Sequence, residues 1–314
     1  MKNYCLLLFL IIALPLSAQV VLIDGVPRDT SYTIYSSYIK EKKKRPYIEI
    51  VKPVFEGLYA EEKVVYKKTG EGRNLHLNVY RPDNEAEYPA LLMVHGGGWN
   101  SGDLSMQTPL ATHIAREGFV CIPVEYRLIP EALYPAGVQD VEDAVKWVYA
   151  NAGKLGIDKN RIVISGCSAG GQLACLVGTA NKDSYIRAVV NIDGISTFLN
   201  EATIERAERA RLEKTKMPVD ATWLGGTYSE NPCNWEDASA LSHVSGNSVP
   251  VCFINSSIPR FHNGRDELVQ KLDSMGIYSE THEIDDSPHT FWFFNPWFDA
   301  TVNYVVSFLN KIQL

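Results

Sequence analysis

The strongest candidate for chemistry in this chain is Ser168, which stands between two glycines in the run Gly-Cys-Ser-Ala-Gly at residues 166–170. An apolar, β-branched run at residues 162–164 precedes it, and the residues that follow carry a helical pattern. A Gly-x-Ser-x-Gly between a strand and a helix is typical of a nucleophile elbow, a tight turn that presents a serine hydroxyl to a carbonyl carbon. The glycines let the strand and the helix approach each other. A chance match is also possible, because turns are rich in glycine and serine.

A second glycine-rich motif, His-Gly-Gly-Gly-Trp at residues 95–99, follows a continuous apolar run at residues 90–94. Such a run is typical of a strand that is covered on both faces. Successive glycines leave their backbone N–H groups unobstructed, and donors of this kind stabilise the negative charge that develops on a carbonyl oxygen during attack. A flexible loop would show the same glycines, but the position before the elbow serine is where an oxyanion loop is expected.

Two histidines compete for the role of general base. His289 follows the last predicted strand at residues 278–284, whereas His262 lies in the loop after the penultimate predicted strand at residues 250–254. Proteins with a nucleophile elbow carry their catalytic groups in the chain order serine, acid, histidine. That order favours His289 over His262.

The elements that would position these groups alternate between strands and helices. This alternation indicates an α/β fold with a mostly parallel central sheet and helices on both faces. Residues 197–225 carry a charged helical stretch, and we expect them to form a small helical cap insertion. The predicted division is a signal peptide at 1–18, an N-terminal extension at 19–56 and a catalytic domain at 57–314.

The composition and the first residues exclude some partners. The 314 residues carry a net charge of −7 at pH 7, which argues against nucleic acid or an anionic membrane. An apolar run at residues 6–16 follows Lys2 and ends in small residues before Gln19, the pattern of an export signal that is too short to span a bilayer. We therefore expect an exported protein, periplasmic or extracellular.

The cysteines show no metal-site spacing, and we expect no metal, no cofactor and no essential disulfide.

Taken together, the motifs resemble those of α/β-hydrolases of the hormone-sensitive-lipase and carbohydrate-esterase (acetylxylan-esterase-like) type. The resemblance rests on residues 95–99, 124–131 and 166–171, and it covers roughly residues 61–309. It implies the α/β-hydrolase fold and a serine hydrolase. The N-terminal part of the chain falls outside it.

Residue by residue, the resemblance implies that Ser168 is the nucleophile. It also implies that the N–H groups of Gly97, Gly98 and Ala169 form the oxyanion hole. The chain departs from the family at the acid of the triad, because Pro259 or its neighbour stands where the family has an aspartate. Proline cannot orient a histidine.

Another carboxylate must then serve as the acid. Asp193 ends the predicted strand at residues 186–192, so it emerges at the carboxyl edge of the sheet beside the serine. A simple Asp-Gly turn is the other interpretation of this residue. Asp266 and Glu267 are the remaining candidates, but they fall inside a predicted helix and would have to reach back toward His289. We predict Asp193 and keep the other two open.

The expected function is that of a secreted serine carboxylesterase that removes acetyl groups from a plant polysaccharide or oligosaccharide, xylan or pectin. Trp99 and Trp292 are expected at the mouth of the site, since flat aromatic surface suits sugar rings. His262 and Arg260 are expected to contact substrate too, and Arg260 could bind a uronate carboxylate. That possibility keeps a pectin methylesterase of the same fold open. A peptidase or lipase of this fold and a catalytically inactive binding protein stay open as well. The sequence does not indicate an oligomeric state.

Overall fold

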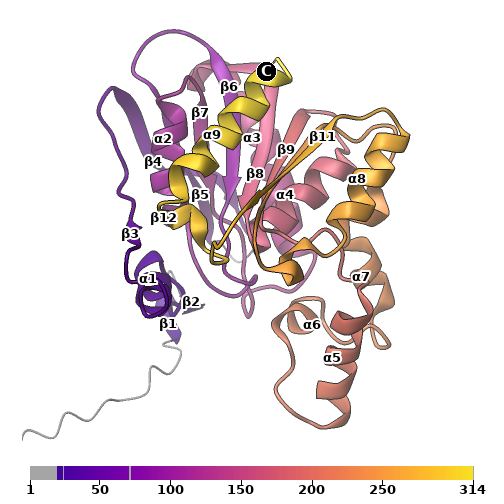
Figure 1. Cartoon of the computed structure of the whole chain (residues 1–314). Helices are drawn as coiled ribbons and strands as arrows, with labels where there is room; N and C mark the ends of the chain where they lie inside the picture. Colours follow the sequence, from indigo (N-terminus) through magenta and orange to yellow (C-terminus); the bar gives the residue numbers. More distant parts are fainter. Residues whose placement is uncertain (1–19, 24, 71, 314) are drawn as a thin grey trace, which may run out of the picture.

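The computed structural model describes residues 20–23, 25–70 and 72–313 (Figure 1). The predicted signal peptide at residues 1–18 lies outside the described residues. The centre of the molecule is an eight-stranded sheet in the order β11-β10-β9-β8-β6-β7-β5-β4. The strands are β4 (Leu58–Lys68), β5 (Asn74–Pro82), β6 (Tyr88–Val94), β7 (Val120–Val124), β8 (Ile157–Cys167), β9 (Ile186–Ile192), β10 (Val251–Ser256) and β11 (Ser279–Ile284).

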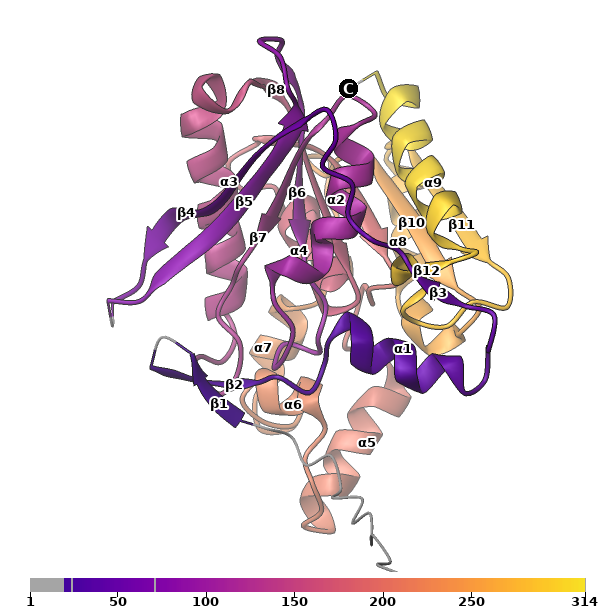
Figure 2. The ribbon, with the colours of Figure 1, turned by 90° about the vertical axis from the view of Figure 1, so that its left-hand side faces the viewer.

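The six strands β6, β7, β8, β9, β10 and β11 all pair in parallel with their neighbours among themselves. Next to β7, the strands β5 and β4 complete the sheet in antiparallel orientation. Helices cover both faces (Figure 2), which confirms the predicted mostly parallel sheet between helical layers. None of the helices in the described ranges combines the length and the apolar character that crossing a bilayer requires. One face carries α3 (Ala136–Leu155), α4 (Ala169–Ala180) and α8 (Arg265–Ser274), and the other carries η1 (Leu104–Gln107), α2 (Thr108–Ala115) and α9 (Phe298–Lys311).

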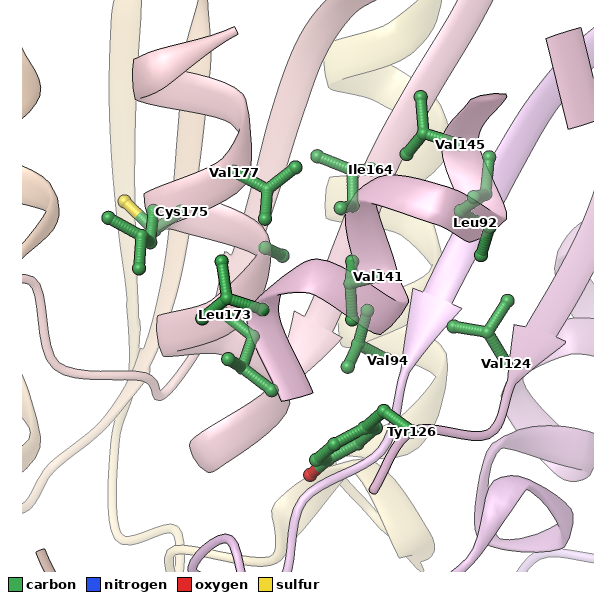
Figure 3. Close-up of a cluster of buried hydrophobic side chains, with 14 of the residues drawn as sticks. Leu92, Val94, Val124, Tyr126, Val141, Val145, Ile164, Leu173, Cys175 and Val177 are labelled. Atoms are coloured by element: carbon green, nitrogen blue, oxygen red, sulfur yellow. The ribbon is translucent and has the colours of Figure 1, made fainter. Parts of the chain in front are cut away.

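Strand β6 shows why the apolar run before the glycine loop has no polar face. Leu92 and Val94 belong to the core on the α3 side, whereas Leu91 and Met93 belong to the core on the α2 side. Successive side chains of a strand point to opposite faces, so a strand covered on both faces needs apolar residues throughout. Figure 3 shows Leu92 and Val94 packed near Val141 of α3.

The segment predicted as an N-terminal extension, for which the sequence indicated no function, packs against the rest of the molecule. It comprises β1 (Val20–Ile23), β2 (Val26–Asp29), α1 (Ile34–Lys42) and β3 (Glu49–Ile50), which pairs with β12 (Phe294–Asn295). Thr33 caps α1, because its hydroxyl accepts a hydrogen bond from the N–H of Ser36 at 3.0 Å. Arg28 anchors the hairpin through an ion pair with Glu125 at 2.8 Å.

Between β9 and β10 the chain leaves the sheet and forms a helical insertion at the carboxyl ends of the strands (Figure 1). The insertion contains the predicted charged helix and continues beyond residue 225. Its elements are α5 (Glu201–Leu212), α6 (Val219–Trp223), α7 (Pro232–Asp237) and η2 (Ala240–His243). Because α5 and α6 supply residues to the cavity described below, we refer to this insertion as the cap.

Candidate active site

Ser168 occupies the sharp turn between β8 and α4, with φ 55° and ψ −120°. An L-residue adopts such a conformation only when its surroundings force it. A Cβ atom on Gly166 would overlap the carbonyl oxygen of Gly170, and one on Gly170 would overlap that of Val94, so both positions require glycine. The Ser168 N–H donates to the carbonyl of Ile192 at 2.8 Å. The turn therefore holds the serine hydroxyl at the carboxyl edge of the sheet.

Three predicted residues form one hydrogen-bonded chain. Ser168 Oγ lies 2.7 Å from Nε2 of His289, and Nδ1 of His289 lies 2.6 Å from Oδ2 of Asp193. Asp193 is fully buried and also accepts hydrogen bonds from the backbone N–H and the hydroxyl of Ser256, at 2.8 and 2.7 Å. Since a carboxylate only accepts, Nδ1 of His289 carries a proton and Nε2 is free to accept the proton of Ser168.

The two other candidates for the acid do not belong to this hydrogen-bonded chain. Asp266 and Glu267 lie in the first turn of α8. The Asp266 side chain is 71% exposed and accepts a hydrogen bond from Nε of Arg265 at 2.7 Å. Neither carboxylate contacts His289, so the geometry favours Asp193 alone among the three candidates.

The glycine loop faces the serine across the site. Gly97 and Gly98 have φ angles of 129° and 58°, and a Cβ on Gly97 would overlap the carbonyl oxygen of Ser101. Gly98 lines the same cavity as Ser168 and Ala169. Ala169 is the first residue of α4, where backbone N–H groups have no partner within the helix. Two of the three predicted oxyanion donors, Gly98 and Ala169, therefore line the cavity beside Ser168.

Side chains fix the glycine loop at both ends. His95 is fully buried, and burial lowers its pKa, so the neutral ring donates from Nδ1 to the carbonyl of Gly96 at 2.8 Å. The Tyr126 hydroxyl donates to the carbonyl of His95 at 2.9 Å. At the other end the indole of Trp99 donates to Oε1 of Gln172 at 2.9 Å. A loop held in this way keeps its N–H groups in place before a substrate arrives.

Cys167 directly precedes the serine, but it is not a rival nucleophile. Its side chain is fully buried, and burial raises the pKa of the thiol to about 12. The thiolate is the reactive form of cysteine, so this thiol is inert at neutral pH.

A cavity of about 400 Å³ opens above the serine. Polar groups from the cap and from the loop after β10 surround its mouth. Arg206 is paired with the Asp220 carboxylate, whereas Arg260 has no carboxylate partner among the described residues. The lining residues are Gly98, Trp99, Ser168, Ala169, Asp193, Ile195, Asn200, Ala202, Thr203, Arg206, Val219, Asp220, Arg260, Phe261 and Asn263.

The tryptophans do not form the expected aromatic mouth. Trp99 lines the cavity but is only 7% exposed, because its indole stacks on Trp223 at 4.9 Å and contacts Phe198. Trp292 is 1% exposed and lies edge-on to the His289 ring at 5.3 Å. The expectation that Trp292 contacts substrate is therefore wrong, since its ring packs in the core.

The other two expected contacts have different outcomes. Arg260 lines the cavity, as the sequence predicted. His262 does not line it, and its Nε2 lies 2.8 Å from the carbonyl oxygen of Ser256. This contact holds the ring near the end of β10, and the expected substrate contact of His262 stays a prediction.

Two residues of the site were not predicted. Ser256 donates twice to Asp193, and Phe261 stacks face to face on His289 with ring centroids 3.4 Å apart and planes 6° apart. Both lie in or beside the loop after β10. No sequence signal distinguishes a serine or a phenylalanine there, because their roles depend on Asp193 and His289, which lie far away in the chain.

Several curated proteins resemble this chain. Esterase LipC of Mycobacterium tuberculosis is 32% identical over 54% of this chain and 44% of its own length. The ethyl acetate hydrolase of Pseudomonas putida is 27% identical over 71% of this chain and 73% of its own length. The chain spans about half the length of the first curated relatives that it matches.

Solved structures show the same fold. A truncated form of a carbohydrate esterase from gut microbiota gives a TM-score of 0.67 at 19% identity, over 83% of this chain and 98% of the other. A hyperthermophilic esterase from the archaeon Pyrobaculum calidifontis gives 0.67 at 24% identity, over 90% and 94%. At these identities the likeness shows the fold alone, and it confirms the predicted α/β-hydrolase fold. Since the BD-FAE family model matches residues 77–280, more than half of the chain, the protein belongs to the BD-FAE family of hormone-sensitive-lipase-like α/β-hydrolases.

Proposed function

We propose that this protein is an exported serine carboxylesterase that removes acetyl groups from a plant polysaccharide or oligosaccharide such as xylan or pectin. The observation that carries the esterase proposal is the hydrogen-bonded chain of Ser168, His289 and Asp193, which lies opposite the glycine loop at the base of an open cavity. The named relatives support it, because LipC is called an esterase and the Pseudomonas protein an ethyl acetate hydrolase.

In the first half of the reaction, Ser168 Oγ attacks the ester carbonyl while Nε2 of His289 accepts its proton. The N–H groups of Gly97, Gly98 and Ala169 donate to the oxygen that becomes negative. Asp193 holds the ring in the correct tautomer and stabilises the imidazolium. His289 then gives the proton to the leaving alkoxide, and the acyl group remains on Ser168.

In the second half, water replaces the alcohol. His289 removes a proton from the water, the hydroxide attacks the acyl carbonyl, and the same N–H groups stabilise the new oxyanion. Collapse releases the acid and returns the proton to Ser168.

The carbohydrate part of the proposal rests on the polar mouth of the cavity. Asn200, Thr203, Asn263 and Arg260 line it and offer donors and acceptors that match a leaving group rich in hydroxyls. The buried tryptophans give no support, since they offer no flat surface for a sugar ring. The likeness to a gut carbohydrate esterase is consistent with this substrate class, as a likeness of fold.

Acetate release tests this proposal. The purified protein is expected to release acetate from acetylated xylan or pectin oligosaccharides and to prefer p-nitrophenyl acetate to p-nitrophenyl octanoate by about tenfold in kcat/KM, a preference worth about 1.4 kcal/mol. Acetate is measured by an enzyme-coupled assay and p-nitrophenol by absorbance. Cleavage of p-nitrophenyl acetate without any acetate from either oligosaccharide would exclude the carbohydrate proposal but keep the esterase. No cleavage of any ester would exclude both.

A second candidate function, a pectin methylesterase, is favoured by Arg260 alone. Its guanidinium lines the cavity without a carboxylate partner among the described residues and could bind the uronate next to a methyl ester. If so, methylated pectin releases methanol, and Arg260→Ala raises KM for it by about tenfold or more, the effect of losing a charged contact. KM for the neutral substrate p-nitrophenyl acetate stays unchanged. Equal KM values for pectin in the wild type and the variant would rule out this function.

Three further classes of protein have less support. A lipase would use the same residues, and a preference for p-nitrophenyl octanoate over p-nitrophenyl acetate would separate it from the proposed esterase. The intact hydrogen-bonded chain at Ser168 gives an inactive binding protein no basis. A peptidase would use the same residues, and aminoacyl anilides in the same assay separate it from an esterase.

A further inference from the structure

The loop after β10 contacts both partners of the catalytic serine. In the family pattern this loop carries the acid of the triad, but here Ile258 and Pro259 stand in that place. The chain forms the short helical turn η3 (Pro259–His262) there instead. Phe261 of this turn lies with its ring parallel to the His289 imidazole, with centroids 3.4 Å apart and planes 6° apart.

The same loop holds Asp193. Ser256, at the end of β10, donates to the Asp193 carboxylate from both its N–H and its hydroxyl. The N–H of Phe261 donates to the carbonyl oxygen of Ile258 at 3.1 Å, which closes the turn. The His262 ring contacts the carbonyl oxygen of Ser256 at 2.8 Å, which holds the turn against Ser256. One short segment, residues 256–262, therefore contacts the acid at one end and the base at the other.

The imidazole needs this contact because its two hydrogen bonds do not fix it completely. They hold Nδ1 and Nε2 at opposite sides of the ring, at 2.6 and 2.7 Å from Asp193 and Ser168. They leave the ring free to tilt about the line that joins its nitrogens. Trp292 meets the imidazole nearly at right angles, at 86°, and Phe261 covers a face of it. Together the two rings remove that tilt.

The phenyl ring also suits the charge that His289 acquires. When His289 accepts the serine proton it becomes an imidazolium, and the face of an aromatic ring attracts a cation. Arg260 lies over the same phenyl ring, with its guanidinium 4.6 Å from the centroid. The imidazole thus covers one face of Phe261, and the residue also lines the cavity.

We propose that Phe261 is a positioning residue, which holds the His289 imidazole in line with Ser168 and Asp193 during the transfer of the serine proton. In this protein the loop after β10 does not supply the acid of the triad. Instead, its residues contact both the acid, Asp193, and the base, His289. This inference rests on the proposed serine-esterase function. It assigns Phe261 to turnover rather than to substrate binding.

Phe261→Leu tests the inference, because leucine keeps an apolar side chain but removes the flat ring. With p-nitrophenyl acetate, kcat is expected to fall about tenfold while KM stays within about twofold. Phe261→Tyr keeps the ring and is expected to restore kcat to within about twofold of the wild type. In proton NMR of the free enzyme, the low-field signal of the His289 Nδ1–H is expected to broaden in Phe261→Leu and to stay sharp in Phe261→Tyr.

Phe55→Leu is the matched control. Phe55 is exposed and makes its ring contact with Tyr80, away from His289, so this variant is expected to keep the wild-type kcat and the sharp signal. The inference is overturned if Phe261→Leu keeps both, if it changes KM alone, or if Phe261→Tyr is as impaired as Phe261→Leu. If the wild type cleaves no ester, the proposed function fails, while the NMR signal still reports whether Phe261 holds the imidazole.

Discussion

Asp193→Asn is expected to lower kcat for p-nitrophenyl acetate by about ten-thousandfold, the loss found when this acid is replaced by its amide in the serine-protease template. The reason lies in the donors around Asp193. The backbone N–H of Ser256 donates to Oδ1 of Asp193, whereas Oδ2 contacts both the Ser256 hydroxyl and His289. The N–H can only donate, so the amide oxygen of an asparagine takes the place of Oδ1. The amide NH2 then faces Nδ1 of His289. The ring must accept that bond at Nδ1 and carry its proton on Nε2, where it can no longer accept the proton of Ser168.

The measurement is a steady-state rate, combined with circular dichroism to show that the variant is folded. Asn and Asp have nearly the same shape, so the fold and KM are expected to stay close to the wild type. Asp266→Asn and Glu267→Gln are the matched controls, because both carboxylates lie on α8 without contact to His289. Their kcat is expected to be unchanged. If Asp193→Asn keeps more than about a tenth of the wild-type kcat, Asp193 is not the acid of this site.

The sequence was most informative where local chemistry fixes the backbone. The elbow at Ser168 and the loop at Gly97 were predictable because only glycine tolerates the close approach at residues 166 and 170 and the φ of 129° at residue 97. The strands were predictable because burial on both faces demands continuous apolar runs. The position of Asp193 followed from the same reasoning, since a residue directly after a parallel strand emerges at the carboxyl edge of the sheet.

What the sequence did not reveal depends on contacts between distant segments. Trp292 was expected at the cavity because it follows His289 closely in the chain, but its side chain packs behind the imidazole. Phe261 carries no pattern of its own, and its importance arises only when β10 and the loop after β11 lie side by side. Periodicity and motif spacing report which residues share an edge of the sheet. They do not report which way an aromatic side chain turns once it is there.

Gly97→Ala is expected to lower kcat by about 100- to 1000-fold, the cost of losing one oxyanion donor. Gly97 has a φ of 129°, which an alanine adopts only with strain, and the added Cβ would overlap the carbonyl oxygen of Ser101. The loop must therefore shift, and its N–H groups move away from the oxyanion. These groups bind the transition state more strongly than the substrate, so the loss appears in kcat rather than in KM.

Gly118→Ala separates this effect from a general loss of stability. Gly118 also has a positive φ, 94°, but it lies before β7 at the amino-terminal edge of the sheet, opposite Ser168. An added Cβ there meets only the ring of Tyr88 at 3.7 Å. Strain without a clash should cost about 1 kcal/mol in the free energy of unfolding and leave kcat unchanged. Urea unfolding and steady-state rates measured on both variants distinguish the two effects. If Gly118→Ala loses as much kcat as Gly97→Ala, destabilisation explains both losses, and the glycine loop has no special role in turnover.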